Sequence, residues 1–351
     1  MIFFIFHKIC LYTTILTKKT IFFRVDGDDG TKVGLGHLNR IVKIFFNIKK
    51  KYNRKFDYVF ILKEYKTGKK FLKKKIKNKL KIIPYNKLNK IIINNKDIFI
   101  IDTLGIEKKL STLLKKNKIS KILSFDETNL SNLKSGIIIN GIFFAKKKLK
   151  KNNKVKIYQG TKYLILDKKF SKFKQKKKQN LLNNVLVTSG GSDHKNMMYK
   201  VIKVLLKFFD LKKINAAVGF GVRKNNILFK IQNKKVRFVK NAANLSNLLS
   251  ECSICICSGG TVMFESIASG NKPLVIQTYE NQKYAIKYFK NKRAIVNLHT
   301  INSRNFEKKL FKTIKRKIKI KNNLPYLNKR NNLVDGKGLF RVFQIIEKFI
   351  N

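Results

Sequence analysis

A chain of 351 residues, 44% of them hydrophobic, is long enough for two domains with separate cores. Its 80 Lys and Arg against 19 Asp and Glu give a net charge of +61, a balance typical of nucleic-acid binding. However, the lysines are spread over the whole length together with abundant Asn and Ile, while Pro is 3 and Trp is 0. We attribute this composition to codon bias and predict no nucleic-acid partner.

Residues 1–16 are apolar and aromatic but are interrupted by His7 and Lys8, so the uninterrupted run is too short to span a bilayer. No basic start or small-residue cleavage site marks a signal peptide. We interpret residues 1–19 as an N-terminal extension and expect no stable membrane insertion.

Cys252, Cys255 and Cys257 crowd into one predicted strand without a fourth ligand nearby. We expect buried free thiols, no metal and a cytoplasmic location.

The first half of the chain alternates strand-like and helix-like patterns. Strands are predicted at 21–25, 58–62, 98–101, 122–125 and 137–139, with helices after residue 36, within 66–80 and over 107–118. Asp102, Asp126 and Asn140 follow three of these strands. In a parallel sheet they would share one edge with the loop after 21–25, although each alone is also an ordinary turn or cap residue.

The first strand leads into a polar loop, 26–30, and then into Gly34-Leu-Gly36-His37, with Arg40 one turn later. Ligands of open α/β sheets bind beyond the carboxyl ends of the strands, so a histidine at this helix start is a candidate functional residue. Arg40 either orients a carboxylate or phosphate, or makes a simple helix salt bridge.

A Lys- and Gln-rich stretch at 170–179 is typical of a linker. A second α/β series follows, with strands at 185–188, 214–218 and 236–239 and helices at 196–208 and 243–250. The turn 189–193 is Gly-rich, and residues 335–338 introduce a last amphipathic helix, 339–350. Two series of similar size predict two Rossmann-like domains facing a cleft.

The segment 254–281 contains a strand, a turn at Gly259-Gly260-Thr261, a helix and another strand. The helix start offers free N–H groups to a phosphate, and Glu265 one turn later could accept hydrogen bonds from ribose hydroxyls. The alternative is an ordinary βα turn with a solvated glutamate.

Three motifs in order resemble the UDP-sugar hydrolases of nonulosonic acid biosynthesis, and the spore-coat polysaccharide proteins of the same type. They are Gly34-x-Gly-His37-x-x-Arg40, Gly190-Gly-Ser-Asp193 and Gly259-Gly-Thr-x-x-x-Glu265. Asn281-Gln282 and Asp335-Gly-Lys-Gly338 fit the same pattern, whereas the loop 26–33 is longer than expected. The resemblance runs from about residue 20 to the end.

The resemblance implies a GT-B fold with two Rossmann-like domains, over 20–170 and 183–351, joined by a linker at 171–182. The first domain would carry the catalytic histidine and face the sugar, the second would bind UDP, and the last helix would pack back toward the first domain. The implied substrate-binding residues are Gly34, Gly36, Arg40, Asp102, Asn140, Asn281 and Gln282. The implied UDP-binding residues are Gly190, Gly191, Ser192, Gly259, Gly260, Thr261 and Glu265.

The resemblance also implies a reaction. His37, with an ordinary pKa of about 6.5, would activate water for attack on the anomeric carbon of a UDP-linked 2,4-diacetamido-2,4,6-trideoxy-hexose, without metal or cofactor. The open alternatives are a hydrolysing 2-epimerase of the legionaminic branch and a GT-B glycosyltransferase. A sugar synthase or a cytidylyltransferase of the same pathway is the expected protein partner.

Overall fold

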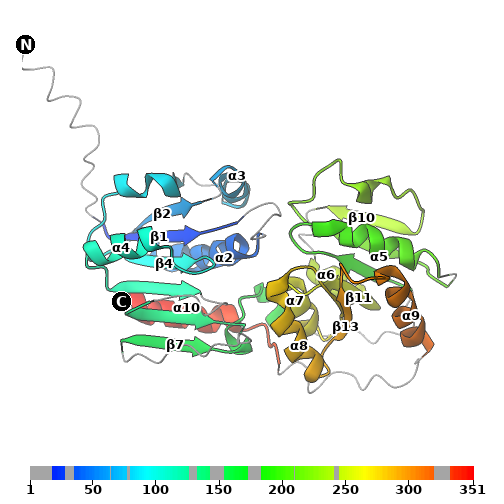
Figure 1. Cartoon of the computed structure of the whole chain (residues 1–351). Helices are drawn as coiled ribbons and strands as arrows, with labels where there is room; N and C mark the ends of the chain where they lie inside the picture. The colour runs from blue at the N-terminus through cyan, green and yellow to red at the C-terminus, as the bar shows by residue number, and fades with distance from the viewer. Residues whose placement is uncertain are drawn as a thin grey trace, which may run out of the picture.

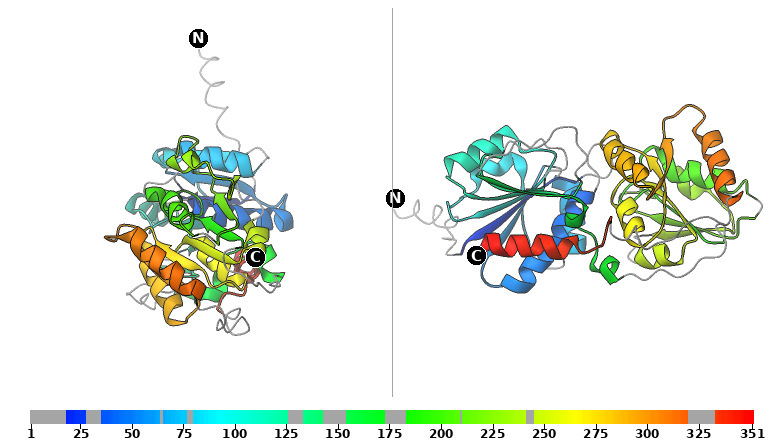
Figure 2. Two further views of the ribbon diagram at one scale, coloured as in Figure 1. Left: turned by 90° about the vertical axis from the view of Figure 1, so that its right-hand side faces the viewer. Right: turned by 90° about the horizontal axis from the view of Figure 1, so that it is seen from below.

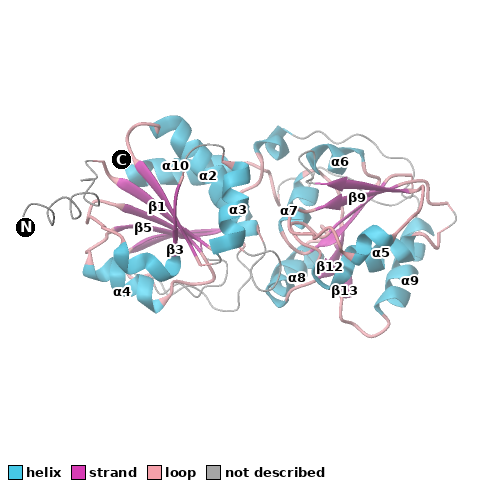
Figure 3. Cartoon of the chain, turned by 90° about the horizontal axis from the view of Figure 1, so that it is seen from above, coloured by secondary structure: helices cyan, strands magenta, loops and turns pink. Residues whose placement is uncertain are grey.

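The computed structural model describes residues 18–27, 35–63, 65–76, 80–125, 133–142, 154–172, 183–208, 210–240, 245–319 and 333–351. They form two sheets with helices on both faces, set side by side (Figures 1 and 3). All strand pairs are parallel, as predicted. Among these residues, no helix combines the length and apolar content needed to cross a bilayer.

The first sheet has seven strands in the order β3-β2-β1-β4-β5-β6-β7. Their bounds are β1 (Thr20–Val25), β2 (Asp57–Leu62), β3 (Lys81–Pro84), β4 (Ile98–Asp102), β5 (Lys121–Phe125), β6 (Gly136–Asn140) and β7 (Val155–Gln159). The accompanying helices are α2 (Gly36–Tyr52), α3 (Tyr65–Lys75) and α4 (Lys108–Lys116), with 3-10 turns η1 (Tyr85–Lys90), η2 (Thr161–Tyr163) and η3 (Lys168–Lys172).

The second sheet has six strands in the order β10-β9-β8-β11-β12-β13. Their bounds are β8 (Val185–Thr188), β9 (Ile214–Val218), β10 (Val236–Lys240), β11 (Ile254–Ser258), β12 (Leu274–Gln277) and β13 (Val296–Thr300). The helices are α5 (Met197–Leu205), α6 (Leu245–Glu251), α7 (Thr261–Ala268), α8 (Lys283–Asn291), α9 (Phe306–Lys319) and α10 (Gly338–Ile350), with 3-10 turns η4 (His194–Asn196), η5 (Ile227–Lys230) and η6 (Glu280–Gln282).

The strand order reverses once in each sheet, between β1 and β4 and between β8 and β11. At such a reversal the connections leave toward opposite faces and open a crevice beyond the carboxyl ends of the strands. His37 follows β1 and Asp102 ends β4, while Gly190 follows β8 and Gly259 follows β11. The motifs of the sequence therefore lie at the two reversal points.

Alternation along the buried strands sends side chains to both faces of each sheet. In β1, Ile21, Phe23 and Val25 pack in the core beneath α2 and α10, whereas Phe22 packs in the core beneath α4. Both faces are covered, so these strands are mostly apolar, the signal that made them predictable; in β1 the exception is Arg24.

The helix α10 follows the second domain in sequence but packs on the first, beside α2 (Figure 2). Leu339, Val342 and Ile346 belong to the core of the first sheet. The turn before it requires glycine: Gly336 has φ +69° and lies against the backbone of Phe170, and a side-chain carbon at Gly338 would overlap the carbonyl oxygen of Leu164. The closing Asp335–Gly338 motif thus shapes a return crossing of the chain.

The two domains are in direct contact. Phe220, in the loop after β9, packs against the core of the first domain, and its ring lies 5.8 Å from that of Phe71 on α3. Lys74 Nζ lies 4.7 Å from the centre of the Phe220 ring. A side-chain carbon at Gly191 would come within 3.4 Å of Leu35 Cβ.

Several elements differ from the predictions. The helix predicted at 196–208 is α5, which begins at Met197 because Lys195 and Asn196 have positive φ angles of 59° and 52°. The strands β3 and β7 were not predicted, since partly exposed edge strands lack a continuous apolar run; β13, α8 and α9 were also not predicted. Residues 1–17, the strand-end residue Asp126, and most of the expected linker lie outside the described residues.

Candidate functional site

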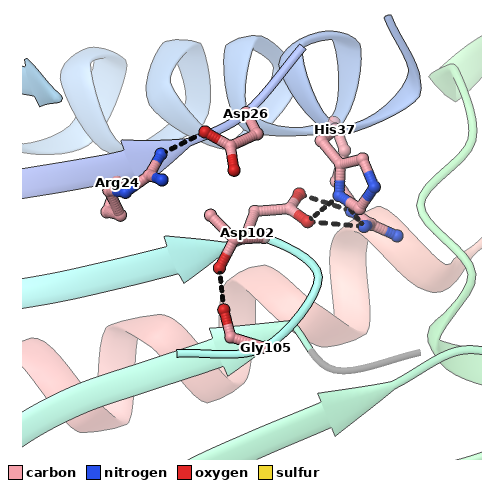
Figure 4. Close-up of polar contacts among 7 residues, drawn as sticks. Arg24, Asp26, His37, Asp102 and Gly105 are labelled. Atoms are coloured by element: carbon pink, nitrogen blue, oxygen red, sulfur yellow. Dashed lines mark hydrogen bonds and ion pairs between the residues drawn. The ribbon is translucent and has the colours of Figure 1, made fainter. Parts of the chain in front are cut away.

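The side chain of His37 lies in the first turn of α2 and is bound to Asp102 at the end of β4. His37 Nδ1 is 2.5 Å from Asp102 Oδ1 (Figure 4). The His37 side chain keeps 14% of its surface exposed, while the Asp102 side chain is fully buried. The carboxylate therefore holds one ring nitrogen from within the domain, and the ring keeps access to solvent.

Arg40 binds both oxygens of the same carboxylate with two of its guanidinium nitrogens, Nε and Nη2. Arg40 Nε donates to Asp102 Oδ2 at 2.7 Å, and Arg40 Nη2 donates to Oδ1 at 2.6 Å. The guanidinium carbon also lies 5.3 Å from the centre of the buried Phe125 ring at the end of β5. The structure thus places Arg40 in an ion pair with Asp102 on β4.

These contacts restrict the charge of Asp102 and the tautomer of His37. Burial alone would raise the pKa of Asp102, but Arg40 and His37 lower it to about 2. The carboxylate is thus ionised at neutral pH and only accepts hydrogen bonds. A neutral imidazole 2.5 Å away must then carry its proton on Nδ1, which leaves the Nε2 lone pair as the basic group.

Other predicted residues of the first domain have different surroundings. Asn140, at the end of β6, is fully buried, and its Oδ1 accepts from the Ile142 N–H at 3.0 Å. Gly36 begins α2 and is exposed, whereas Gly34 lies outside the described residues.

The two Gly-rich turns of the second domain lie next to each other. Ser258 Oγ, at the end of β11, donates to the carbonyl oxygen of Ser189 at 2.9 Å. The N–H of Gly190 donates to Thr188 Oγ1 at 3.2 Å, and φ at Gly190 is +88°, a value that favours glycine. Ser192 follows and is partly exposed. The turns after β8 and β11 are thus joined into one rim.

The helix α7 begins at Thr261, with Gly260 preceding it. The N–H of Gly259 donates to the carbonyl oxygen of Ile276 at 3.1 Å, and this N–H is therefore already used within the sheet. The first N–H groups of a helix lack partners within it, so Thr261 and Val262 present theirs at the start of α7. Thr261 is exposed there.

Glu265 lies one turn into α7 and is half-buried. Burial raises its pKa to about 7; Lys43 on α2 opposes this rise, and Asp167 adds to it. Among the described residues, no hydrogen bond or ion pair to the carboxylate is found. An acceptor of this kind is suited to a pair of hydroxyl groups.

The side chain of Gln282 forms hydrogen bonds with the loop after β12. Its Oε1 accepts from the N–H of Thr278 at 2.9 Å and from that of Tyr279 at 3.3 Å. These contacts direct Nε2 toward Gly260, where a side-chain carbon would lie 3.8 Å away. Gln282 thus has an amide donor next to the start of α7, whereas its neighbour Asn281 is exposed.

The starts of α2 and α7 face each other across the domain junction. A side-chain carbon at Gly36 would be 3.9 Å from Thr261 Oγ1. Both helices therefore direct their positive ends toward the same region, an arrangement that favours an anionic group between them. Among the described residues, no group of three or more His, Cys, Asp or Glu side chains could hold a metal ion.

Sequence reasoning missed a second charged cluster at this edge. Arg24 in β1 is fully buried and forms an ion pair with Asp26 (Figure 4). It forms a second ion pair with Glu107. Its guanidinium carbon lies 4.5 Å from the centre of the Tyr85 ring. The sequence did contain a sign of this cluster, because an arginine within a predicted buried strand needs acidic partners. The cluster ties the loop after β1 to the start of α4, beside the backbone that carries Asp102.

Asp193 was quoted only as part of a motif, and the structure places it in the interior. Its Oδ1 accepts from the N–H of Met198 at 3.0 Å, which anchors the start of α5. Burial raises the pKa of Asp193 to about 6, although hydrogen bonds from Met198 and its neighbours lower it in part. The residue therefore anchors the start of α5 directly after the Gly190 turn.

The sequence is similar to two curated proteins. It is 30% identical over 274 residues to an uncharacterized protein of Methanocaldococcus jannaschii, which covers 73% of this chain and 55% of that protein. The chain thus spans about half the length of this relative. It is 25% identical over 334 residues to the spore coat polysaccharide biosynthesis protein SpsG of Bacillus subtilis, covering 91% of this chain and 96% of SpsG. No known protein-family model matches the chain.

Among solved structures, MurG of Acinetobacter baumannii superimposes with a TM-score of 0.58 at 11% identity, over 94% of this chain and 99% of MurG. At this identity the likeness concerns the fold alone. Two Rossmann-like domains with parallel sheets, arranged as in MurG, confirm the predicted GT-B fold.

Proposed function

We propose that this chain is a hydrolase that cleaves a UDP-linked 2,4-diacetamido-2,4,6-trideoxy-hexose into UDP and the free sugar, as a step of pseudaminic-type nonulosonic acid biosynthesis. The observation that carries the proposal is the position of His37. Its Nδ1 is bound by Asp102, and α2, on which it lies, starts opposite the start of α7. A base and an anion-binding helix start thus face a common region.

In the proposed reaction, His37 Nε2 removes a proton from water while the water oxygen attacks the anomeric carbon from the face opposite UDP. The bond between that carbon and the β-phosphate oxygen breaks, and UDP leaves with the electron pair. The N–H groups at the start of α7 and the Nε2 amide of Gln282 stabilise the developing phosphate charge. Inversion at the anomeric carbon follows from the opposed positions of base and leaving group.

Glu265 would accept hydrogen bonds from the ribose hydroxyls, at one turn from the diphosphate. The relation to SpsG, a protein named for spore coat polysaccharide biosynthesis, supports a role in making a cell-surface polysaccharide. A cytoplasmic location and a sugar synthase or cytidylyltransferase as partner remain predictions that accompany this proposal.

The proposal is tested by incubating the protein with the UDP-linked sugar in the absence of any acceptor and following UDP and sugar by NMR. We expect both products in equal amounts. Release of a sugar inverted at C2 would favour the hydrolysing 2-epimerase instead. Tight UDP binding without release would favour a glycosyltransferase that lacks its acceptor.

His37→Asn is the informative variant, because the asparagine amide can still donate to Asp102 in place of Nδ1–H, while Nε2 is lost. We expect kcat to fall by about 10²–10⁴-fold with the UDP dissociation constant unchanged. His299→Asn is the matched control, since His299 is exposed on β13 and has a positive φ that asparagine tolerates. Equal activity of both variants would remove His37 from the mechanism.

A further inference from the structure

We infer that Arg40 is a positioning residue that keeps His37 neutral, and therefore available as a base, by neutralising the Asp102 carboxylate that the two residues share. The inference deepens the proposed function, because a neutral His37 matters only if this residue accepts a proton during turnover. Its direct test, however, measures the charge of His37 and needs no turnover.

His37 and Arg40 share the carboxylate of Asp102. Asp102 Oδ1 accepts from His37 Nδ1 at 2.5 Å and from Arg40 Nη2 at 2.6 Å, and Oδ2 accepts from Arg40 Nε at 2.7 Å. A buried carboxylate bound to a histidine alone would stabilise the imidazolium. Here the guanidinium has already balanced that negative charge.

The Arg40 guanidinium would also repel a protonated His37 directly. Arg40 Nη2 lies 3.2 Å from His37 Nδ1. Protonation of His37 would place a second positive charge beside the guanidinium, with one carboxylate between the two. The guanidinium cannot release its own proton in this range of pH, so the repulsion favours the neutral form of His37.

Other charged groups near the His37 ring also bear on its protonation. His37 is in the first turn of α2, where the helix dipole also opposes a positive charge. Asp26 after β1 is engaged by Arg24, and on α7 the charge of Glu265 faces Lys43 of α2. Asp102 is thus a fully buried carboxylate bound to His37 Nδ1, and Arg40 decides how much of its charge the ring experiences.

The guanidinium of Arg40 is held in one position, so its electrostatic effect on His37 does not vary. It lies over the ring of Phe125, and its Nε and Nη2 are both hydrogen-bonded to the Asp102 carboxylate. A lysine at this position would keep the positive charge but could not bind both oxygens in parallel. Charge and geometry can therefore be separated by substitution.

The test is an NMR titration of the His37 ring. The chain contains four histidines, so the His37 signal is assigned by its loss in His37→Asn. We expect the pKa of His37 to rise by about one unit or more in Arg40→Gln, and to remain near its value in the unmodified protein in Arg40→Lys. A rise of the same size in both variants would assign the effect to lost geometry and would overturn the inference.

Arg40→Gln leaves a buried carboxylate without its cation and could fail to fold. The comparison is then repeated between Asp102→Asn and the double variant Asp102→Asn/Arg40→Gln, in which no bare carboxylate remains. The pKa of His37 should again be higher by about one unit or more when the arginine is absent. No rise in either comparison would overturn the inference.

The pH dependence of UDP release provides a second readout. The acidic limb of kcat/KM should move to higher pH in Arg40→Gln by the same amount as the titration. If the His37 titration shifts as expected but neither the unmodified protein nor Arg40→Gln releases UDP, the inference on Arg40 stands and the proposed hydrolase function fails. If UDP is released but the His37 titration does not shift, the hydrolase function stands and the inference on Arg40 fails.

Discussion

Gly36 of α2 and Thr261 of α7 lie against each other across the domain junction, with room for a side-chain carbon 3.9 Å from Thr261 Oγ1. These residues begin helices that leave the reversal points of two different sheets. Each helix start carries about half a positive charge. An anion between them would interact with both domains, so binding of a nucleoside diphosphate should favour their association.

Asp102 should make the protein sensitive to acid. Its pKa is lowered from 3.8 to about 2 in the folded protein, so the ionised form stabilises the fold at any pH above the unfolded value. This stability, about 2 kcal/mol, should be lost as pH falls from about 4 toward 2. Urea unfolding at pH 6, 4 and 3 measures it. Asp102→Asn should flatten this part of the profile, and an unchanged slope would contradict the assignment.

Asp193 should have the opposite effect. Its pKa is raised from 3.8 to about 6, so folding favours the protonated form and the free energy of unfolding should fall as pH rises from about 4 to 6. Asp193→Asn keeps Oδ1 as the acceptor for Met198 and removes the charge. We expect it to stabilise the protein at pH 7 by up to about 3 kcal/mol and to have little effect at pH 4. Equal effects at both pH values would show that Asp193 is not buried as a charge.

Glu265 should impose a pH dependence on UDP binding, if it binds the ribose as proposed. With a pKa of about 7, it is an ionised acceptor above this pH and a weaker one below it, so UDP affinity should decrease as pH falls through 7. Glu265→Gln should weaken binding by about 10–100-fold at pH 8. Calorimetry across this range measures the affinities. UDP affinity is measured over the same pH range on Glu265→Gln, which corrects for the ionisation of UDP itself. If the affinities of the variant and of the unmodified protein depend on pH in the same way, Glu265 does not bind the ribose.

Gly338 should be intolerant of any side chain. A methyl group there would overlap the carbonyl oxygen of Leu164, which is backbone and cannot rotate away. We expect Gly338→Ala to destabilise the protein by about 1–3 kcal/mol through displacement of α10. Lys337→Ala, at an exposed neighbouring position, is the control. A thermal melt with equal midpoints for both variants would argue against the close contact.

Much of the fold was accessible from the sequence because its central strands are buried on both faces. Strands such as β4 and β11 are nearly continuous apolar runs, and β11 is followed by a glycine turn with its helix beginning three residues later. Edge strands were not accessible: β7 reads Val-Lys-Ile-Tyr-Gln and is only partly buried. Its pairing with β6 depends on tertiary contacts that no local pattern records.

Part of the candidate site could also be predicted from the sequence, because the positions of its central strands could. His37 and Asp102 could be assigned to one sheet edge, because the carboxyl ends of parallel strands meet there. That Asp102 binds both His37 and Arg40 could not be foreseen, since it depends on how α2 is rotated above β4. Arg24 was overlooked because a strand pattern treats a single charged residue as an interruption, whereas the structure buries it between Asp26 and Glu107.

The return of α10 to the first domain has a consequence for how the protein is made. During synthesis, the first sheet emerges long before α10, yet Leu339, Val342, Ile346 and Ile350 contribute to its core. Until the ribosome has released them, part of the apolar surface of α2 is uncovered. The first domain should therefore reach its native state only after the second has been synthesised, and the nascent chain should depend on chaperones during that interval.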